Sequence, residues 1–351
     1  MIQTKCQYMR LGKRMSRVRS SKAEIKNFDE DVVWKRKHVL DLDDFTVDEI
    51  NTVLNTTKAM NEVLERDVKK VPILRGKTIL NMFYEPSTRT KVSFEVAGKV
   101  LSADVVSISS SSSSSAKGES LIDTGLTLRA ASADVIVLRH PQAGSPYLLA
   151  RHLSNVSIIN AGDGCHAHPT QGLLDLYTIL SNVGRIRGIK VAIIGDVAHS
   201  RVARSNIWGL AKMGAKVALC GPKTLLPMDM LRGGKFSNSE VFNNVVVESD
   251  INLAIESADV VMALRIQKER FNNSLVPSLR EYAAQWQINR ERLKVAKRDV
   301  LLMHPGPVNE GVEISPELVH GDQSVIEEQV SNGVAVRMAL LYLVCTSRKD
   351  E

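Results

Sequence analysis

The chain alternates short apolar runs with amphipathic helical patterns, and this alternation restricts the possible folds more than any other feature of the sequence. In the first half, strands are predicted at 78–83, 104–108, 134–138 and 156–159, with helices near 88–101, 119–131 and 146–153 between them. Strands that alternate with helices favour a parallel sheet, because each helix carries the chain back to the edge where the next strand starts. We therefore predict an α/β domain, entered through a helix that begins after a capping box at Thr46.

The same pattern starts again after a helix predicted from Gly172 to about Asn182. The strands of this second half are expected at 190–194, 216–220, 245–248, 259–264 and 299–303, with one helix near 201–213 and a final apolar helix at about 323–346. The economical interpretation is an α/β fold of two doubly wound parallel-sheet domains of similar size, linked by helices near residue 170. The final helix fits either domain.

The net charge of +7 comes from 46 basic and 39 acidic side chains, and the excess lies at the N-terminus. The first 23 residues contain seven Lys or Arg side chains and no acid, so the rest of the chain is balanced. A balanced body gives little support for nucleic-acid binding, which depends on basic groups that neutralise phosphates. We predict no nucleic-acid partner, and we expect residues 1–33 to form a disordered basic extension.

Further features of the sequence concern the compartment. No stretch approaches 18 uninterrupted apolar residues, and the N-terminus lacks the apolar core of a secretory signal. The four Cys side chains are scattered, without the spacing of a metal site. We expect a cytoplasmic protein with no membrane partner. An organelle is the alternative, because a basic, acid-free N-terminus is also typical of a transit peptide.

Polar side chains follow most of the predicted strands, at the end of an open parallel sheet where ligands bind. The strongest of these segments is Ser87-Thr88-Arg89-Thr90, which follows the first strand and opens a helix. Free backbone N–H groups, the positive end of the helix dipole and a guanidinium would meet there, as in a phosphate site. An ordinary serine N-cap is the alternative, but Arg89 in the first turn opposes the dipole unless an anion is bound.

A second strand end, at Gly195, opens a helix but lacks the glycine pattern of a dinucleotide site, so no NAD cofactor is predicted. Arg201 begins the helix that follows, and Arg265 comes after a strand two positions away. Paired arginines suit planar carboxylates, which they bind through two parallel hydrogen bonds. Each arginine alone would be interpreted as a solvated surface residue.

The histidines near the domain junction are the remaining candidates. His168 precedes Pro169 at a helix start, and with Gln171 one turn later it could hydrogen-bond a small polar ligand. His166, His168 and Asp163 lack the spacing of a metal site, so no metal is predicted. No nucleophile elbow or Ser/His/Asp order is present. The site therefore suits a reaction in which the enzyme orients two substrates and stabilises developing negative charge.

Several specific motifs follow one another along the chain. They are Phe-Tyr-Glu-Pro-Ser-Thr-Arg-Thr at 83–90, Lys117-Gly118-Glu119, Arg139-His140, Asn160-Ala161-Gly162-Asp163-Gly164, His168-Pro169-Thr170-Gln171, the segment 195–205, Arg265-Ile266-Gln267 and His304-Pro305-Gly306-Pro307. From about Lys37 to Val344, the chain with these motifs resembles the aspartate carbamoyltransferase family. Ornithine carbamoyltransferases share some of the motifs, but their Ser-Met-Gly element is missing here.

The resemblance implies transfer of the carbamoyl group of carbamoyl phosphate to L-aspartate, a step of de novo pyrimidine (UMP) biosynthesis that needs no cofactor. By position, it implies carbamoyl phosphate binding by Ser87, Thr88, Arg89, Thr90, Ser113, Lys117, Arg139, His168, Gln171, Gly306 and Pro307. It assigns catalysis to Thr90, Lys117, Arg139 and His168, and aspartate binding to Lys117, Arg201, Arg265 and Gln267. The backbone of Pro305 would join Gln171 at the carbamoyl nitrogen.

The resemblance also implies an architecture. Residues 34–169 with the C-terminal helix 322–347 would bind carbamoyl phosphate, and residues 170–321 would bind aspartate. The serine-rich run 109–115 by itself suggests only a solvated loop, but the resemblance implies that Ser113 and the lysine that follows the run, Lys117, reach into the active site of a neighbouring subunit. A homotrimer with shared active sites is therefore expected, and further assembly with regulatory or dihydroorotase chains stays open.

Two other functions are left open by the residues. A carbamoyltransferase for ornithine or a modified ornithine would need a pocket for a cation, whereas Arg201 and Arg265 favour a dicarboxylate. A catalytically silent subunit would have no need of Lys117 or His168. Both alternatives can be separated from the main prediction by assay and ligand binding.

Overall fold

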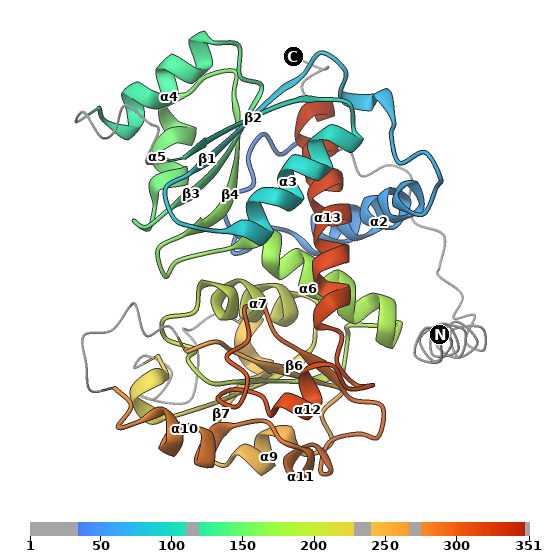
Figure 1. The fold of residues 1–351 in the computed structure, drawn as a ribbon, viewed down its shortest axis with the longest axis vertical. Coiled ribbons are helices and arrows are strands. Elements are labelled where there is room, and N and C mark those ends of the chain that lie inside the picture. Colours follow the sequence, from blue (N-terminus) through green and yellow to red (C-terminus); the bar gives the residue numbers. More distant parts are fainter. Residues whose placement is uncertain (1–33, 110–118, 228–239, 267–274, 348–351) are drawn as a thin grey trace, which may run out of the picture. The chain divides into compact units, whose positions relative to one another are not determined.

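The computed structural model describes residues 34–109, 119–227, 240–266 and 275–347, which Figure 1 draws in colour. Three predicted site residues, Ser113, Lys117 and Gln267, lie outside these ranges, as do the extension 1–33 and the serine run beyond Ser109. The compact unit begins at Trp34 and contains two parallel sheets.

The first sheet has the strand order β2-β1-β3-β4, and its neighbouring strands pair in parallel. The strands are β1 (Thr78–Phe83), β2 (Asp104–Ser109), β3 (Val135–His140) and β4 (Ser157–Asp163), and the connecting helices are α3 (Thr88–Val100), α4 (Leu121–Ala130) and α5 (Ser145–His152). In this register Ile79 of β1 faces Val105 of β2 on one side and Val135 of β3 on the other. The alternation of apolar runs and helices thus gives the predicted sheet.

Strand β4 extends to Asp163, whereas the predicted strand ended at Ile159. Asn160 and Asp163, which have the composition of a loop, are both fully buried in the strand. The Asn160 side chain donates to the carbonyl oxygen of Leu40, so a polar residue is satisfied inside the sheet. Pairing between β3 and β4 shifts between Leu138 and His140.

The second sheet has the order β7-β6-β5-β8-β9, again with parallel neighbours. The strands are β5 (Lys190–Ile194), β6 (Lys216–Cys220), β7 (Val245–Glu248), β8 (Val260–Ala263) and β9 (Leu301–Met303). The helices are α7 (Arg201–Lys212), α9 (Ile251–Ile255), α10 (Leu279–Trp286), α11 (Arg290–Leu293) and α12 (Pro316–Val319), with the 3₁₀ helices η5 (Lys223–Leu225) and η6 (Glu240–Asn244). A further 3₁₀ helix, η2 (Pro72–Leu74), precedes β1 of the first sheet. The predicted fold class is confirmed. The short helices α9 to α12 were not predicted, because one or two turns give no helical period in sequence.

Three long helices lie beside the sheets: α2 (Val47–Leu64), α6 (Pro169–Val183) and α13 (Ile326–Thr346). The predicted capping box of α2 is confirmed, since the Thr46 hydroxyl accepts from the Glu49 N–H and the Glu49 carboxylate accepts from the Thr46 N–H. Helix α6 starts earlier than predicted, because Pro169 occupies its first turn, where a missing N–H costs nothing. Helix α13, red in Figure 1, packs against α2, α3 and α6.

The core is shared between the sheets. One apolar cluster contains Ile79 of β1, Val191 of β5 and Leu340 of α13, all fully buried. A shared core fixes the strand ends of the two sheets relative to each other, and the site described below depends on that placement. In the part of the chain that the structure describes, no helix has both the length and the apolar character needed to cross a bilayer.

Candidate functional site

A cavity of about 780 Å³ lies where strands and helices of both sheets end. Each predicted site residue that falls within the described ranges lines it: Ser87, Thr88, Arg89, Thr90, Arg139, His168, Gln171, Arg201, Arg265, Gly306 and Pro307. Among the described lining residues, Glu85 is the single acid, whereas five are arginines. The cavity is therefore built for anions.

The start of α3 forms one corner of the cavity. Ser87 occupies the N-cap position, but its side chain makes no capping hydrogen bond, so the ordinary N-cap role is wrong. The first turn holds no acidic residue and carries Arg89, which lines the cavity and is exposed. Partial desolvation of its guanidinium, with a smaller contribution from nearby Arg265, lowers the pKa of Arg89. A phosphate would supply the negative charge that this corner lacks.

Gly306, in the motif at 304–307, lies against Arg89 at the start of α3. Its φ is +64°, and a Cβ atom there would lie 2.9 Å from Cζ of Arg89. A side chain at position 306 would therefore be strained and would also displace the guanidinium. Glycine lets the backbone of residues 304–307 reach Arg89.

Glu85 joins the two arginines that the sequence assigned to different substrates. Its Oε2 lies 2.8 Å from Nη2 of Arg201 on α7 and 3.3 Å from Nε of Arg139 on β3. Arg201 also donates from Nη1 to the carbonyl oxygen of Gly164 at 3.1 Å. In the sequence, Glu85 was only part of the motif at 83–90 and was given no role. The signal that could have indicated its role is an acid two residues before the anion-binding run that starts at Ser87.

Two buried histidines in the cavity are neutral. Burial, reinforced by Arg139, Arg201 and Arg337, lowers the pKa of His168 well below its ordinary value. Burial likewise lowers the pKa of His304 to about 3. Nδ1 of His304 accepts from the Gly306 N–H at 2.8 Å, so its ring proton is on Nε2. Positive charge in the cavity is thus carried by arginines, and the imidazoles act as neutral hydrogen-bonding groups.

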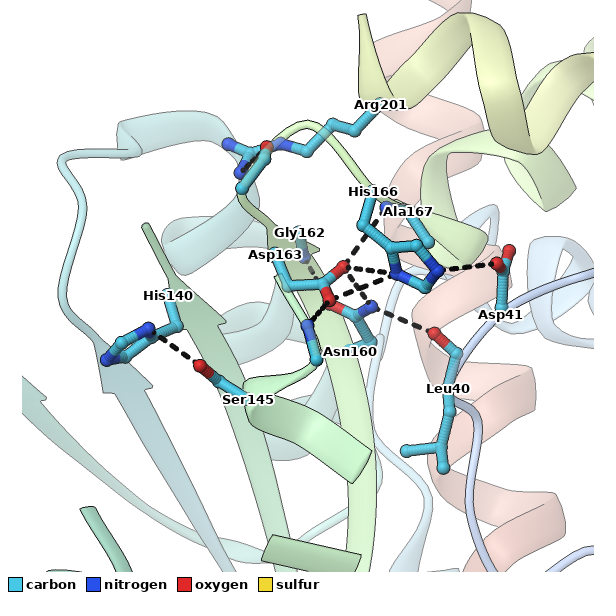
Figure 2. A network of polar contacts seen from close by, with 12 residues as sticks. Leu40, Asp41, His140, Ser145, Asn160, Gly162, Asp163, His166, Ala167 and Arg201 are labelled. Carbon is cyan, nitrogen blue, oxygen red and sulfur yellow. Dashed lines mark hydrogen bonds and ion pairs between the residues drawn. The ribbon is translucent and has the colours of Figure 1, made fainter. Parts of the chain in front are cut away.

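Figure 2 shows how the turn between β4 and α6 is held. Asp163 accepts from the backbone N–H groups of Gly144 and Ala167, at 2.8 and 3.1 Å, and from the Asn160 side chain at 2.8 Å. His166 places Nδ1 3.1 Å from Asp163 and Nε2 3.6 Å from Asp41. This turn carries Gly164, which positions Arg201, and leads directly into His168.

Asp163 and His166 in this turn each stabilise the charged form of the other. Burial alone would raise the pKa of Asp163, but hydrogen bonds from His166, Asn160 and Gly144 outweigh it and lower the pKa. The hydrogen bond to Asp163 raises the pKa of His166, although burial and nearby Arg204 oppose the rise. A histidine with a raised pKa stabilises the fold fully below its unfolded pKa and loses this contribution as pH rises through the raised value.

We therefore expect His166→Asn to destabilise the protein more at about pH 6 than at about pH 9, because asparagine keeps an amide donor but carries no charge. The expected loss at the lower pH is about 1.5–3 kcal/mol, as for a hydrogen bond between charged groups. Denaturant unfolding at both pH values measures it. His152→Asn, at an exposed histidine in the last turn of α5, is the control and should show no such difference. A destabilisation by His166→Asn that grows with pH would contradict the prediction.

Comparisons with known proteins agree with this geometry. A family model for the aspartate/ornithine carbamoyltransferase carbamoyl-P binding domain matches residues 37–181, and one for the Asp/Orn binding domain matches residues 187–344. The aspartate carbamoyltransferase catalytic subunit of Dehalococcoides mccartyi is 56% identical over 317 residues, covering 90% of this chain and 94% of the relative.

Solved structures show the same fold. An aspartate transcarbamoylase from Trypanosoma cruzi, in complex with N-(phosphonacetyl)-L-aspartic acid, has a TM-score of 0.78 at 29% identity over 88% of this chain and 96% of the other. An ornithine carbamoyltransferase from Pyrococcus furiosus also has a TM-score of 0.78, at 29% identity over 88% and 97% of the two chains. Fold similarity alone therefore does not separate the two acceptor amino acids.

The chain belongs to the aspartate/ornithine carbamoyltransferase family. Within that family it is similar over most of its length to catalytic subunits of aspartate carbamoyltransferase, from Dehalococcoides mccartyi and, at 56% identity, from a Roseiflexus species. The resemblance that the motifs indicated is confirmed.

Proposed function

We propose that the chain transfers the carbamoyl group of carbamoyl phosphate to the amine of L-aspartate, giving N-carbamoyl-L-aspartate and phosphate. The observation that carries the proposal is the placement of Arg201 and Arg265 in the same cavity as the helix start at Ser87–Thr90. The helix start suits a phosphate, and the pair of arginines suits a dicarboxylate. The high identity to aspartate carbamoyltransferase catalytic subunits supports aspartate over ornithine.

In this reaction, Ser87, Thr88, Arg89 and Thr90 hold the phosphate at the start of α3. Thr90, Arg139 and His168 polarise the carbonyl oxygen, while Gln171 and the backbone of Pro305 bind the carbamoyl nitrogen beside Gly306 and Pro307. Arg201 and Arg265, with Gln267, hold the aspartate carboxylates. Ser113 and Lys117 complete the site. Ser113, Lys117 and Gln267 rest on the motif resemblance, since they lie outside the described residues.

The chemistry needs no protein base. The neutral amine of aspartate attacks the carbonyl carbon, the C–O bond to phosphate breaks, and the departing phosphate takes the amine proton. Negative charge develops first on the carbonyl oxygen and then on the phosphate, and the cavity meets both with preorganised donors. A neutral His168 fits this role, because it can donate a hydrogen bond without taking part in proton transfer.

The domain roles are part of the proposal. Residues 34–169 with the C-terminal helix 322–347 would bind carbamoyl phosphate, and residues 170–321 would bind aspartate. Packing of α13 against α2 and α3 supports assigning the last helix to the first domain. A cytoplasmic location, with an organelle as the alternative, stays a prediction from the sequence.

We also propose a homotrimer. Val92 and Val96 on α3 expose 48% and 39% of their surface, and Val106 on the edge strand β2 exposes 50%, so apolar side chains are exposed near the β2 edge of the first sheet. Strand β2 leads directly into the segment that carries Ser113 and Lys117. A second copy docked at the β2 edge would receive Ser113 and Lys117 in its cavity. Further assembly with regulatory or dihydroorotase chains stays open.

An assay with carbamoyl phosphate and either amino acid tests the proposed function. We expect turnover of aspartate and none of ornithine, because the arginines would repel the ornithine cation. Turnover of ornithine but not aspartate would overturn the proposal. A bisubstrate mimic that carries a phosphonate and a dicarboxylate should bind tightly, whereas absence of binding would favour a catalytically silent subunit.

A further inference from the structure

A single carboxylate lies behind the cavity, on the far side of Gln171. Asp175 is on α6, one turn after Gln171, and is fully buried. Its Oδ1 accepts from Nε2 of Gln171 at 3.0 Å and from Nε2 of Gln329 at 2.8 Å, while its Oδ2 accepts from Nδ2 of Asn206 at 2.7 Å. Three side-chain amides, from α6, α7 and α13, therefore meet on one acid.

The hydrogen bond to Asp175 decides which end of the Gln171 amide serves the cavity. A side-chain amide can be turned either way, and only its partners fix the choice. An ionised carboxylate accepts and never donates, so Nε2 of Gln171 must face it. The Gln171 side chain lines the cavity, and the atom it can offer a ligand is then the carbonyl Oε1. An acceptor at this position suits a ligand N–H group.

The same acid orients the last motif through Gln329. Because Nε2 of Gln329 donates to Asp175, its Oε1 faces the other way and accepts from the backbone N–H of His304 at 3.0 Å. His304 is the residue before Pro305, whose backbone belongs to the proposed site for the carbamoyl nitrogen. Asp175 is thus connected to both groups that would bind this nitrogen, one on helix α6 and the other in the segment that follows strand β9.

The charge of Asp175 is retained at a cost. Burial raises its pKa to about 6, although hydrogen bonds from Asn206, Gln329 and Gln171 and the nearby Arg337 lower it again. Burying an acid whose partners are mainly neutral amides lowers the stability of the folded protein, and a neutral residue of the same size would lower it less. An asparagine would present an NH2 group with two donors on one side and a carbonyl oxygen on the other. Because this amide could turn either way, one of its orientations would place N–H groups against Gln171 and Gln329, and the orientation of these amides would no longer be fixed.

We propose that Asp175 is a positioning residue, which turns Gln171 and, through Gln329, the segment 304–306 so that the cavity recognises the amino group of carbamoyl phosphate. This inference rests on the proposed function. Asp175 contributes to recognition of the amino group of carbamoyl phosphate without touching the substrate itself.

Asp175→Asn tests the inference with three ligands of the same corner. Carbamoyl phosphate has the amino group, acetyl phosphate has a methyl group in its place, and inorganic phosphate has neither. We expect the KM for carbamoyl phosphate to rise about tenfold in the variant, as for loss of one or two neutral hydrogen bonds in a buried site. The inhibition constants of acetyl phosphate and inorganic phosphate should stay within about twofold of wild type, because neither ligand uses the amide acceptor.

Asn206→Ala is the matched control. It removes one amide from Asp175 but leaves Gln171 and Gln329 in place, so the ratio of the acetyl phosphate inhibition constant to the carbamoyl phosphate KM should stay at its wild-type value. If Asp175→Asn does not fold, Gln329→Met replaces it, because this variant keeps the acid and Gln171 and removes the link to His304. The same ratio should then fall about threefold or more.

The outcomes separate the two proposals. An equal loss of affinity for all three ligands, or an unchanged ratio in a folded variant, would overturn the role of Asp175. If the wild-type protein makes no N-carbamoyl-L-aspartate, the proposed function itself fails, and the inference fails with it.

Discussion

Replacement of Arg89 by alanine is expected to lower kcat/KM for carbamoyl phosphate by about a thousandfold, the loss found when a transition state loses a preorganised charged donor. Arg89 stands in the first turn of α3, a turn without an acid, and is backed by Gly306. The loss should be larger in the reaction than in binding, because charge on the phosphate grows as the C–O bond breaks.

Steady-state kinetics with aspartate at saturation measure this effect, and inhibition by inorganic phosphate separates binding from catalysis. Arg89→Lys keeps the charge but loses the planar fork, so we expect an intermediate loss of about a hundredfold. Arg129→Ala is the control: Arg129 is an exposed arginine of α4 that bonds the Ser154 hydroxyl. Activity of Arg89→Ala within tenfold of wild type would show that the start of α3 is not the phosphate site.

The strand ends explain why so much of this site could be predicted from sequence. Apolar runs and helical patterns have different periods, so the parallel sheets can be recognised in one dimension. Once a sheet is parallel, its carboxyl ends lie on one edge, so Arg89 after β1 and Arg139 at the end of the neighbouring strand β3 are expected to converge although 50 residues separate them. Both line the same cavity, as that argument requires.

The parts that escaped prediction depend on partners that sequence does not pair. Gln329 lies 154 residues from Asp175, and nothing in the sequence around either residue indicates that the Gln329 amide donates a hydrogen bond to the Asp175 carboxylate. Glu85 was visible at a strand end, but its role requires that Arg139 and Arg201 approach it from different elements. Asn160 and Asp163 were taken for the start of a loop, because buried polar residues in a strand become acceptable only when tertiary partners satisfy them.

A mixture of two inactive variants, Arg89→Ala and Lys117→Ala, is expected to regain about a quarter of wild-type activity when subunits exchange at random within a three-fold symmetric trimer. The proposal places Arg89 in the site of its own subunit and Lys117 in the site of a neighbour. Every mixed trimer then has one site with both residues intact, whichever variant is in the majority. About three quarters of randomly assembled trimers are mixed, so about one site in four is complete.

The control for this experiment follows from the cavity. Arg89 and Arg201 line it together in one chain, so a mixture of Arg89→Ala and Arg201→Ala contains no complete site in any trimer and should stay inactive. Each pair is dissociated in mild denaturant, mixed, returned to buffer and assayed, with trimer formation checked by mass determination during gel filtration. Rescue in the first pair and none in the second requires a shared site. Equal recovery in both pairs would show that the single variants were not inactive to begin with. No recovery in either pair, with mixed trimers present, would show that Lys117 acts in its own subunit and would contradict the proposal that sites are shared between neighbours.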